Sequence, residues 1–300
     1  MAKTQSWEVS DSFWKKVEPL IPKPERNPEK AYKRKAGGGR KPMPPRQIFE
    51  AIMYVLRTGC QWKALPKERF GSPSAIHTHF MRWMRAGFFV ALWRSGLAEY
   101  DEMEGIAWKW QSIDGAMVKA PLAQEAVGRN PTDRGKKRGT KRHLLVDGRG
   151  VPLSLVVTGA NRHDVSQLEL VLDEIIIERP QDIEQNLCAD KGYDGQPALE
   201  LIVSKCYIPH VKRRGEEIQE KRKNPGWKAR RWVVEVSHSW FNRFRKILVR
   251  YEKLTDTYLD LPQFSGHLGK PNVYGQQEVF HCQRKNERLT TVNLRRRPWH

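Results

Sequence analysis

Hydrophobic positions recur at helical spacing through the first third of the chain. The pattern of residues 7–22 predicts a short amphipathic helix, with Ser10 as its N-cap and Pro22 at its end. A second helix is predicted from Arg46, and Gly59 ends its run of apolar residues. The apolar face of this second helix is expected to carry Ile48, Ile52, Val55 and Leu56.

Two further helical segments follow, at 74–86 and within 87–100. In the first of them, one side of the helix carries Ile76, Phe80, Trp83 and Met84. Short helices with tight turns and basic flanks are typical of a helix-turn-helix-like module, although a plain helical bundle that binds nothing has the same pattern. We therefore expect residues 1–100 to form a helical DNA-binding domain, with a basic linker at 23–45 that is rich in Pro, Gly, Lys and Arg.

From about residue 106 the spacing of apolar residues becomes strand-like. Strands are predicted at 108–119, 143–147, 151–158, 186–190 and 207–212, and the turn DGRG joins the second to the third. Helices are predicted at 164–178, at 196–204 and from 224 to about 254. This order predicts a mixed α/β sheet with helices packed on it, in a domain of residues 105–256.

The last of these helices can be analysed by angle, because each residue of an α-helix turns by about 100°. With Glu235 at the origin, the apolar residues that lie roughly opposite are Val233, Trp240, Phe244 and Tyr251, with Val236 and Ile247 beside that stripe. The polar residues that fall within about 60° of Glu235 are Arg231, His238 and Asn242. Glu235 is therefore expected on a polar face, which an ordinary solvent-facing stripe would also explain.

Two aspartates occupy strand positions in the predicted sheet. Asp114 stands inside an otherwise apolar strand, and Asp190 stands where a strand gives way to a glycine-containing turn. Aspartate is disfavoured in strands, and a buried unpaired carboxylate is costly unless a metal or a cation compensates it. Together with Glu235, these carboxylates can converge at one edge of the sheet. Such hard oxygen ligands select Mg²⁺ or Mn²⁺, and two ions about 4 Å apart can support phosphoryl transfer.

Three other acidic residues compete for the same role. Asp147 lies in the hairpin turn, where Asp-Gly is common for conformational reasons alone. Asp164 is interpreted as a helix N-cap, and Asp194 as a residue that supports Asp190 from the same turn. None of the three is favoured as a primary metal ligand.

Composition narrows the class of partner. The chain has 54 Lys and Arg against 34 Asp and Glu, a formal charge of +20, which points to a polyanion and first of all to nucleic acid. A basic but merely solvated surface is the alternative. Four widely spaced cysteines indicate neither a zinc finger nor a disulfide framework. Because no signal-peptide core and no long apolar run is present, we expect a soluble intracellular protein without a membrane partner.

Several segments are informative in combination. They are SIDGAMVKA, TKRHLLVDGRGVPLSLVVTGANRHD, ADKGYDG and ARRWVVEVSHSWFNRFRK, preceded by GGGRKPMPPRQIFEAIMYVLRTGCQWKALP. The combination resembles the bacterial insertion-sequence transposases of family five, and within them the subgroup with an Asp-Gly-Ala first motif, over roughly residues 5–258. The resemblance implies a ribonuclease-H-like fold with a DDE triad of Asp114, Asp190 and Glu235, which would bind two Mg²⁺ or Mn²⁺ ions.

The resemblance also implies residues that contact DNA. The wider clan often has a Tyr-x2-Arg-x3-Glu-x6-Lys pattern around the glutamate. Here Arg231 matches the Arg, whereas Lys228 stands at the Tyr position and Asn242 at the Lys position. The DNA contacts expected on this basis are Arg231, His238, Asn242, Arg243, Lys191 and Tyr193.

The implied function is a transposase that cuts double-stranded DNA at terminal inverted repeats and joins it to target DNA, as a homodimer or larger assembly in the bacterial nucleoid. Residues 257–300 depart from the family, because they are polar, basic and poorly periodic. They predict an irregular tail, which is either a DNA-contacting arm or a replaced end that compromises the enzyme. Two alternatives stay open: a transposase-derived protein that binds DNA without cutting it, and a ribonuclease-H-like nuclease that cuts without joining.

Overall fold

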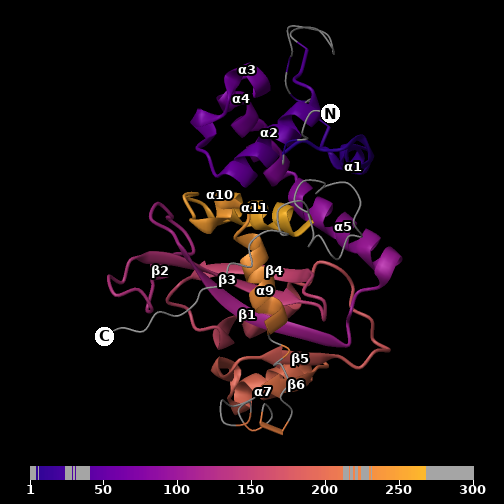
Figure 1. The fold of residues 1–300 in the computed structure, drawn as a ribbon, viewed down its shortest axis with the longest axis vertical. Helices are drawn as coiled ribbons and strands as arrows, with labels where there is room; N and C mark the ends of the chain where they lie inside the picture. Colours follow the sequence, from indigo (N-terminus) through magenta and orange to yellow (C-terminus); the bar gives the residue numbers. More distant parts are fainter. Residues whose placement is uncertain are drawn as a thin grey trace, which may run out of the picture.

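The first part of the protein is helical (Figure 1). In this computed structural model the described residues are 7–23, 41–211 and 232–267, with a few isolated positions outside these ranges. The helices of the first part are α1 (Asp11–Val17), α2 (Pro45–Thr58), α3 (Lys67–Phe70), α4 (Pro73–Arg85) and α5 (Phe88–Glu104). Two short 3-10 helices, Glu18–Leu20 and Trp62–Ala64, lie between them.

Helix ends in this part follow the sequence signals. Ser10 caps α1, since its side chain accepts a hydrogen bond from the backbone N–H of Phe13 at 3.1 Å. Helix α2 ends at Gly59, whose φ of 71° is a left-handed value that favours glycine. A side chain at Gly59 would also bring its Cβ within 2.9 Å of the Arg245 Cβ. Most of the predicted linker, including 24–28 and 32–40, falls outside the described residues.

The second part is built on one mixed sheet whose central strand is β1 (Trp110–Lys119). On one side β1 pairs antiparallel with β3 (Arg138–Val146), which in turn pairs antiparallel with β4 (Pro152–Gly159). On the other side β1 pairs parallel with β5 (Asn186–Ala189), and β5 pairs parallel with β6 (Ile208–Val211). A two-residue strand, β2 (Gly128–Arg129), joins the start of β3.

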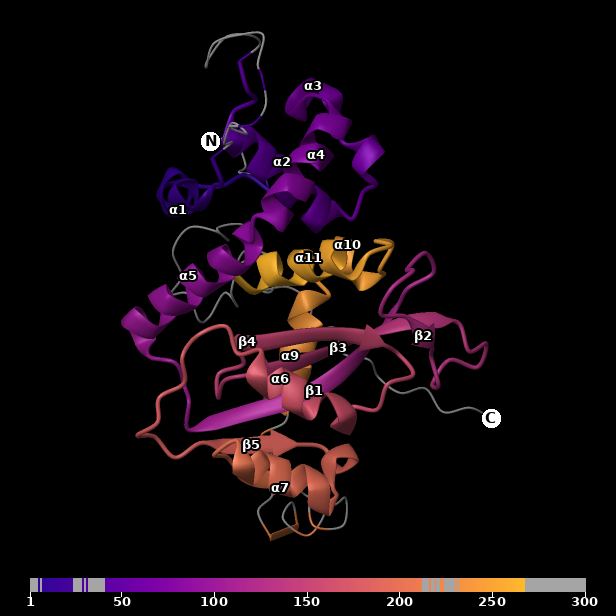
Figure 2. The ribbon, with the colours of Figure 1, turned by 180° about the vertical axis from the view of Figure 1, so that it is seen from behind.

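Helices cover both faces of this sheet. Helix α9 (Trp232–Phe241) packs on β1 and β3 and lies in front of the sheet in Figure 1. Helix α6 (Leu168–Asp173), which follows the 3-10 helix Val165–Gln167, packs on β3 and β4 and is in front when the molecule is seen from behind (Figure 2). Helix α7 (Gln196–Ser204) packs on β6. The predicted fold class, a ribonuclease-H-like mixed sheet preceded by a helical region, is confirmed.

The long final helix predicted through residue 254 is wrong in its length. Helix α9 ends at Phe241, and a separate short helix, α10, spans Arg245–Leu248. Between them Phe244 has an extended backbone conformation, with φ −95° and ψ 98°. After α10 the chain returns to the sheet, where Val249 forms a parallel bridge with Lys119 and the Arg250 N–H donates to the Lys119 carbonyl at 2.8 Å. This pairing with β1 competes with continuation of the helix.

The irregular tail predicted from residue 257 is wrong for its first eleven residues, because Thr255–His267 form a helix, α11. It packs mainly against α5, and Tyr258, Leu261 and Phe264 are fully buried. Figures 1 and 2 show α11 between the N-terminal helices and the sheet. Residues 268–300 lie outside the described residues. Within the described part, no helix is long and apolar enough to cross a membrane.

Candidate active site

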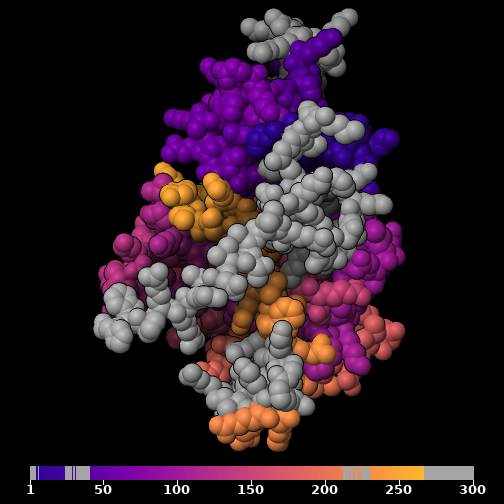
Figure 3. Space-filling model, viewed as in Figure 1, coloured from indigo at the N-terminus to yellow at the C-terminus, as the bar shows by residue number. Residues whose placement is uncertain are grey.

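Three carboxylates from three elements line one small pocket beside the central strand. The pocket has a volume of about 70 Å³ and is lined by Ile113, Asp114, Asp190, Val234 and Glu235. Strand β1 supplies Ile113 and Asp114, and α9 supplies Val234 and Glu235. Asp190 follows the end of β5. Figure 3 shows atoms of α9 at the surface near the middle of the molecule, so the outer face of this helix is accessible.

Asp114 stands in the middle of β1, opposite Leu144 of β3. Its Oδ2 lies 4.0 Å from Nε2 of His238 in α9, so Asp114 is on the face of the sheet that α9 covers. The pKa of Asp114 is raised to about 6, chiefly by burial and also by the nearby carboxylates of Asp190, Asp164 and Glu235, against a hydrogen bond from the Gly115 backbone that lowers it. The site therefore holds uncompensated negative charge in the protein alone.

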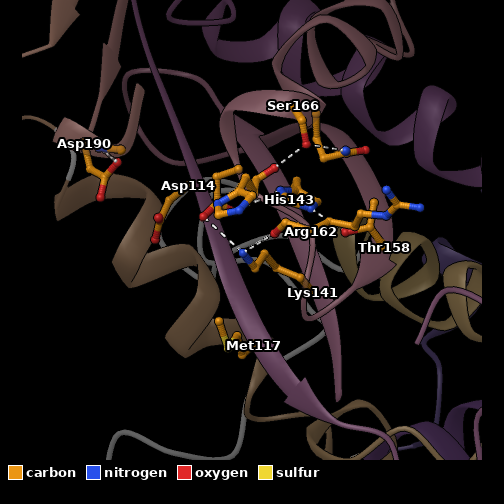
Figure 4. A network of polar contacts seen from close by, with 12 residues as sticks. Asp114, Met117, Lys141, His143, Thr158, Arg162, Ser166 and Asp190 are labelled. Carbon is orange, nitrogen blue, oxygen red and sulfur yellow. Dashed lines mark hydrogen bonds and ion pairs between the residues drawn. The ribbon is translucent and has the colours of Figure 1, made fainter. Parts of the chain in front are cut away.

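Asp190 follows directly after β5, at the level of Asp114. The parallel register pairs Ser112 with Cys188, and both aspartates lie two residues further along their strands. The carboxylate of Asp190 accepts a hydrogen bond from the Gly192 backbone N–H at 2.7 Å, which fixes its orientation at the start of the Lys191–Tyr193 turn. Figure 4 shows Asp190 and Asp114 on the same side of β1.

Glu235 lies on the exposed side of α9, as predicted, but the boundary of the buried face differs from the prediction. The buried residues are Val233, Val234, Ser237, His238, Trp240 and Phe241. Val236, which was expected beside the apolar stripe, is 42% exposed, and His238, which was expected on the polar face, is 7% exposed. Compared with the side that the apolar residues alone indicate, the buried face of α9 is rotated toward Val234 and His238 and away from Val236.

His238 contacts the site from below the surface and does not reach solvent. Its Nε2 lies 4.0 Å from Oδ2 of Asp114. Burial lowers the pKa of His238 to about 3, and the charge of Arg142 lowers it further. The ring is thus neutral at ordinary pH, and the contact is a packing contact between an imidazole and a carboxylate. The ring is covered in this structure, and the contact of His238 with DNA stays a prediction.

The other predicted DNA contacts are distributed unevenly. Tyr193 is 1% exposed, so its ring is likewise covered in this structure, and its contact with DNA stays a prediction. Lys191 is exposed and adjoins Asp190 at the pocket. Asn242 and Arg243 are exposed, but they follow the end of α9 and so do not share the helical face of Glu235. Arg231 lies outside the described residues.

Asp147 has the structural role that its turn predicts. Its carboxylate is fully buried and accepts hydrogen bonds from the backbone N–H groups of Ala107, Arg149 and Val151 at 2.8–3.0 Å. The Tyr100 hydroxyl donates a fourth at 3.1 Å. These donors hold the β3–β4 turn against α5 and leave Asp147 away from the pocket.

Asp164 does not act as the N-cap that the sequence predicts, because its side chain makes no capping hydrogen bond. Its carboxylate instead pairs with Lys141 Nζ at 3.2 Å and His143 Nδ1 at 3.3 Å, both on β3. Sequence reasoning missed these two partners. The available signal was Gly115, a residue without a side chain in the middle of a strand, where another backbone or side chain often approaches closely.

The three pocket carboxylates suit a divalent cation of the hard, oxygen-binding kind. Among the described residues, no three His, Cys, Asp or Glu side chains meet closely enough to enclose a single ion. A ready-made cage is not required, because Mg²⁺ is usually held by one or two carboxylates together with waters and substrate phosphates. The raised pKa of Asp114 marks the charge that such an ion would neutralise.

A ribonuclease-H-like sheet that presents two aspartates from neighbouring strands and a glutamate from the helix across them defines the class of DDE domains. The particular family follows from two matches. Residues 111–261, half of the chain, match the family model described as "Transposase DDE domain", and residues 9–93 match "Putative transposase of IS4/5 family". The chain belongs to this transposase family, and the family implies dependence on a divalent metal ion.

Two relatives come from Burkholderia cepacia. The chain is 33% identical over 137 residues to "Putative transposase for insertion sequence element IS402", which covers 44% of this chain and 62% of that protein. It is 29% identical over 124 residues to "Insertion element IS402 uncharacterized 16.2 kDa protein", covering 41% of this chain and 80% of that one. The chain thus spans less than two thirds of the first relative.

A solved structure, the catalytic domain of Mos1 mariner transposase, matches 62% of this chain and 90% of that chain at 9% identity. The TM-score is 0.27, and a likeness at that level supports no inference about this protein.

Proposed function

We propose that this protein cleaves DNA strands at the inverted-repeat ends of an insertion sequence and transfers them to target DNA, in a reaction that depends on Mg²⁺ or Mn²⁺. One observation carries the proposal: Asp114, Asp190 and Glu235 line a single pocket. Membership in the transposase family supports the type of reaction.

In this proposal Asp114, Asp190 and Glu235 would hold two divalent ions. Bound ions of this kind activate an attacking oxygen and stabilise the leaving oxygen of a phosphodiester. The chain itself contributes fixed geometry: β1 and β5 present their aspartates at one level, and the Gly192 N–H orients Asp190. Glu235 closes the site from the exposed side of α9.

Double-stranded DNA is the proposed partner, and the formal charge of +20 supports it. Lys191, exposed beside Asp190, is the proposed phosphate contact nearest the pocket, and Arg243 is a second exposed candidate. Phosphate contacts of this kind fix position and carry no sequence information. The N-terminal helices, α2 to α4, are proposed to read the terminal repeats. Because transposition joins two element ends, we expect a dimer or larger assembly on DNA.

The test is end cleavage of a DNA duplex that carries the sequences flanking this reading frame, with Mg²⁺ present. Wild type is expected to release a nicked strand and then a strand-transfer product. Asp114→Ala, Asp190→Ala and Glu235→Ala are expected to bind the duplex and to lose both products. Asp173→Ala, which replaces an exposed residue at the end of α6, is the matched control and should behave as wild type.

Three outcomes would contradict parts of this proposal. Full activity in one triad variant removes that residue from the site. Cleavage without joined product by wild type indicates a nuclease. Salt-sensitive binding by wild type without metal-dependent cleavage indicates a DNA-binding protein that has lost catalysis. The packed helix α11 removes one structural reason for that last outcome, since residues 257–267 are ordered against α5.

A further inference from the structure

Gly115, the residue after Asp114, faces the side of the sheet away from α9. It pairs with His143 of β3 in the antiparallel register, and paired residues point to the same face. A Cβ built at Gly115 would lie 2.1 Å from Oδ1 of Asp164 and 3.1 Å from Cδ of Lys141. The space that a side chain at this position would need is therefore taken by the carboxylate of Asp164.

This carboxylate is held from two sides by β3. Lys141 Nζ lies 3.2 Å from Oδ2, and His143 Nδ1 lies 3.3 Å from Oδ1. Lys141 also donates to the Arg162 carbonyl at 2.8 Å, and the other ring nitrogen of His143 lies 2.8 Å from the Thr158 hydroxyl. In Figure 4, Lys141, His143 and Arg162 gather on the opposite side of β1 from Asp190. We call Lys141, His143 and Asp164 the Asp164 cluster.

The carboxylate of Asp164 keeps its negative charge. Burial acts to raise the pKa of Asp164, but hydrogen bonds and charge from His143 and Lys141 outweigh burial and leave the pKa lowered. Lys141 and His143 are themselves buried and the Asp164 side chain is 33% exposed, so the ion pair with Lys141 is partly shielded from solvent. Removing Asp164 would leave the buried ammonium group of Lys141 without its counter-charge, which is costly.

We propose that Asp164 is a positioning residue for the metal centre. Lodged over Gly115 and anchored by Lys141 and His143, it fixes the segment of β1 that presents Asp114 on the other face. The proposal rests on the proposed function, because it assumes that Asp114 binds metal. Residues that support metal ligands from behind commonly change metal affinity or activity about 10–100-fold when they are replaced.

The test measures Mn²⁺ binding to the full chain by isothermal titration calorimetry, at a temperature where every variant is folded by circular dichroism. Asp164→Asn keeps the shape of the side chain but loses its charge, and it is expected to weaken Mn²⁺ binding at least tenfold with unchanged stoichiometry. Asp173→Asn is the control: it removes the charge of an exposed carboxylate at the end of α6, which pairs with Lys205 after α7, and its Mn²⁺ affinity should equal that of wild type.

A stability control separates positioning from general weakening of the fold. Phe264→Ala removes a buried ring far from the pocket and should lower the melting temperature more than Asp164→Asn does, while its Mn²⁺ affinity stays at the wild-type value. Equal loss of Mn²⁺ affinity in both variants, scaling with melting temperature, would overturn the positioning role.

A double substitution directly tests the close approach of the Asp164 carboxylate to Gly115. Gly115→Ala should weaken Mn²⁺ binding or folding, because its methyl group collides with Asp164. In the Asp164→Ala background the collision is gone, so Gly115→Ala should lower the melting temperature less there than it does in wild type. An equal effect of Gly115→Ala in both backgrounds, or a Gly115→Ala protein that matches wild type, would contradict this close approach.

The remaining outcomes are distinct from a failure of the proposed function. If wild type binds no Mn²⁺, the metal centre itself is refuted. If wild type binds Mn²⁺ and Asp164→Asn binds it equally well, only the positioning role fails. Loss of one Mn²⁺ equivalent in Asp164→Asn would make Asp164 a metal ligand and would also overturn positioning.

Discussion

Phe264 of α11 packs edge-on against Phe49 of α2, with ring centroids 5.0 Å apart. The same ring contacts Phe89 of α5 at 5.6 Å. These contacts join the last described helix to the N-terminal helices, and α11 also packs on β4 of the sheet. Residues far apart in the chain therefore form one core, and the integrity of the sheet depends on residues beyond the triad.

The first prediction concerns this contact. Phe264→Ala should lower the free energy of unfolding by about 4 kcal/mol, because it deletes a fully buried aromatic ring and leaves a cavity. Urea denaturation followed by tryptophan fluorescence measures the change. Leu254→Ala, at a 43% exposed position just before α11, is the control and should cost far less. Equal effects of the two would show that α11 is not part of the core.

The second prediction concerns Asp147. Asp147→Ala leaves three backbone N–H groups and the Tyr100 hydroxyl without their buried acceptor, so it should destabilise the fold by about 3 kcal/mol. Metal binding should be retained at temperatures where the variant is folded. Asp133→Asn, in a more exposed turn, should change stability little. Loss of Mn²⁺ binding in folded Asp147→Ala would contradict the purely structural role.

The third prediction is a pH dependence. The ordinary pKa of Asp114 is 3.8, and burial raises it to about 6. A raised pKa means that the metal-free fold gains stability from this group at low pH and loses it as pH rises through about 6. A metal ion binds the deprotonated carboxylate, so stabilisation of the fold by metal binding increases as the pH rises. The increase in melting temperature caused by Mn²⁺ should therefore be large at high pH and small at low pH.

This dependence is measured as the difference between melting curves with and without Mn²⁺, at pH values on either side of 6. The difference is the proper readout, because burial and Asp256 raise the pKa of Asp260 to about 7, and Asp260 titrates in the metal-free curve as well. Asp260→Asn should leave the difference intact. An Mn²⁺ effect of equal size at both pH values would contradict the assignment of Asp114 as a ligand.

The fourth prediction concerns Lys191. If this exposed side chain neutralises one phosphate, Lys191→Ala should weaken binding to all duplexes alike and should reduce the slope of log affinity against log salt by about 0.9. Fluorescence anisotropy over a salt series measures the slope. Lys205→Ala removes a lysine that pairs with Asp173 away from the pocket, and its slope should stay unchanged. An unchanged slope for Lys191→Ala would exclude the phosphate contact.

Local patterns in the sequence predict much of this fold. The caps at Ser10 and Gly59, the order of strands and helices, and the exposure of Glu235 all follow from neighbouring residues. That Asp114, Asp190 and Glu235 line one pocket was also predicted, from strand order and from family resemblance together.

Long-range contacts account for what the sequence did not predict. The apolar spacing from Trp240 to Tyr251 continues through the end of α9, and only the pairing of Val249 with Lys119 reveals the break. Helix α11 looks polar in isolation and is ordered by contacts with α5 and α2. Asp164 precedes a helical segment and thus resembles a helix cap. Its partners are instead on β3, and one of them, Lys141, is 23 residues before it in the chain.

The most direct test of the central claim is a crystal structure of the full chain soaked with Mn²⁺, with anomalous data collected at the manganese edge. We predict anomalous peaks within coordination distance of Asp114, Asp190 and Glu235, and no such peaks in Asp114→Ala crystals treated identically. Manganese bound elsewhere, or a pocket that stays free of it at saturating Mn²⁺, would contradict the account.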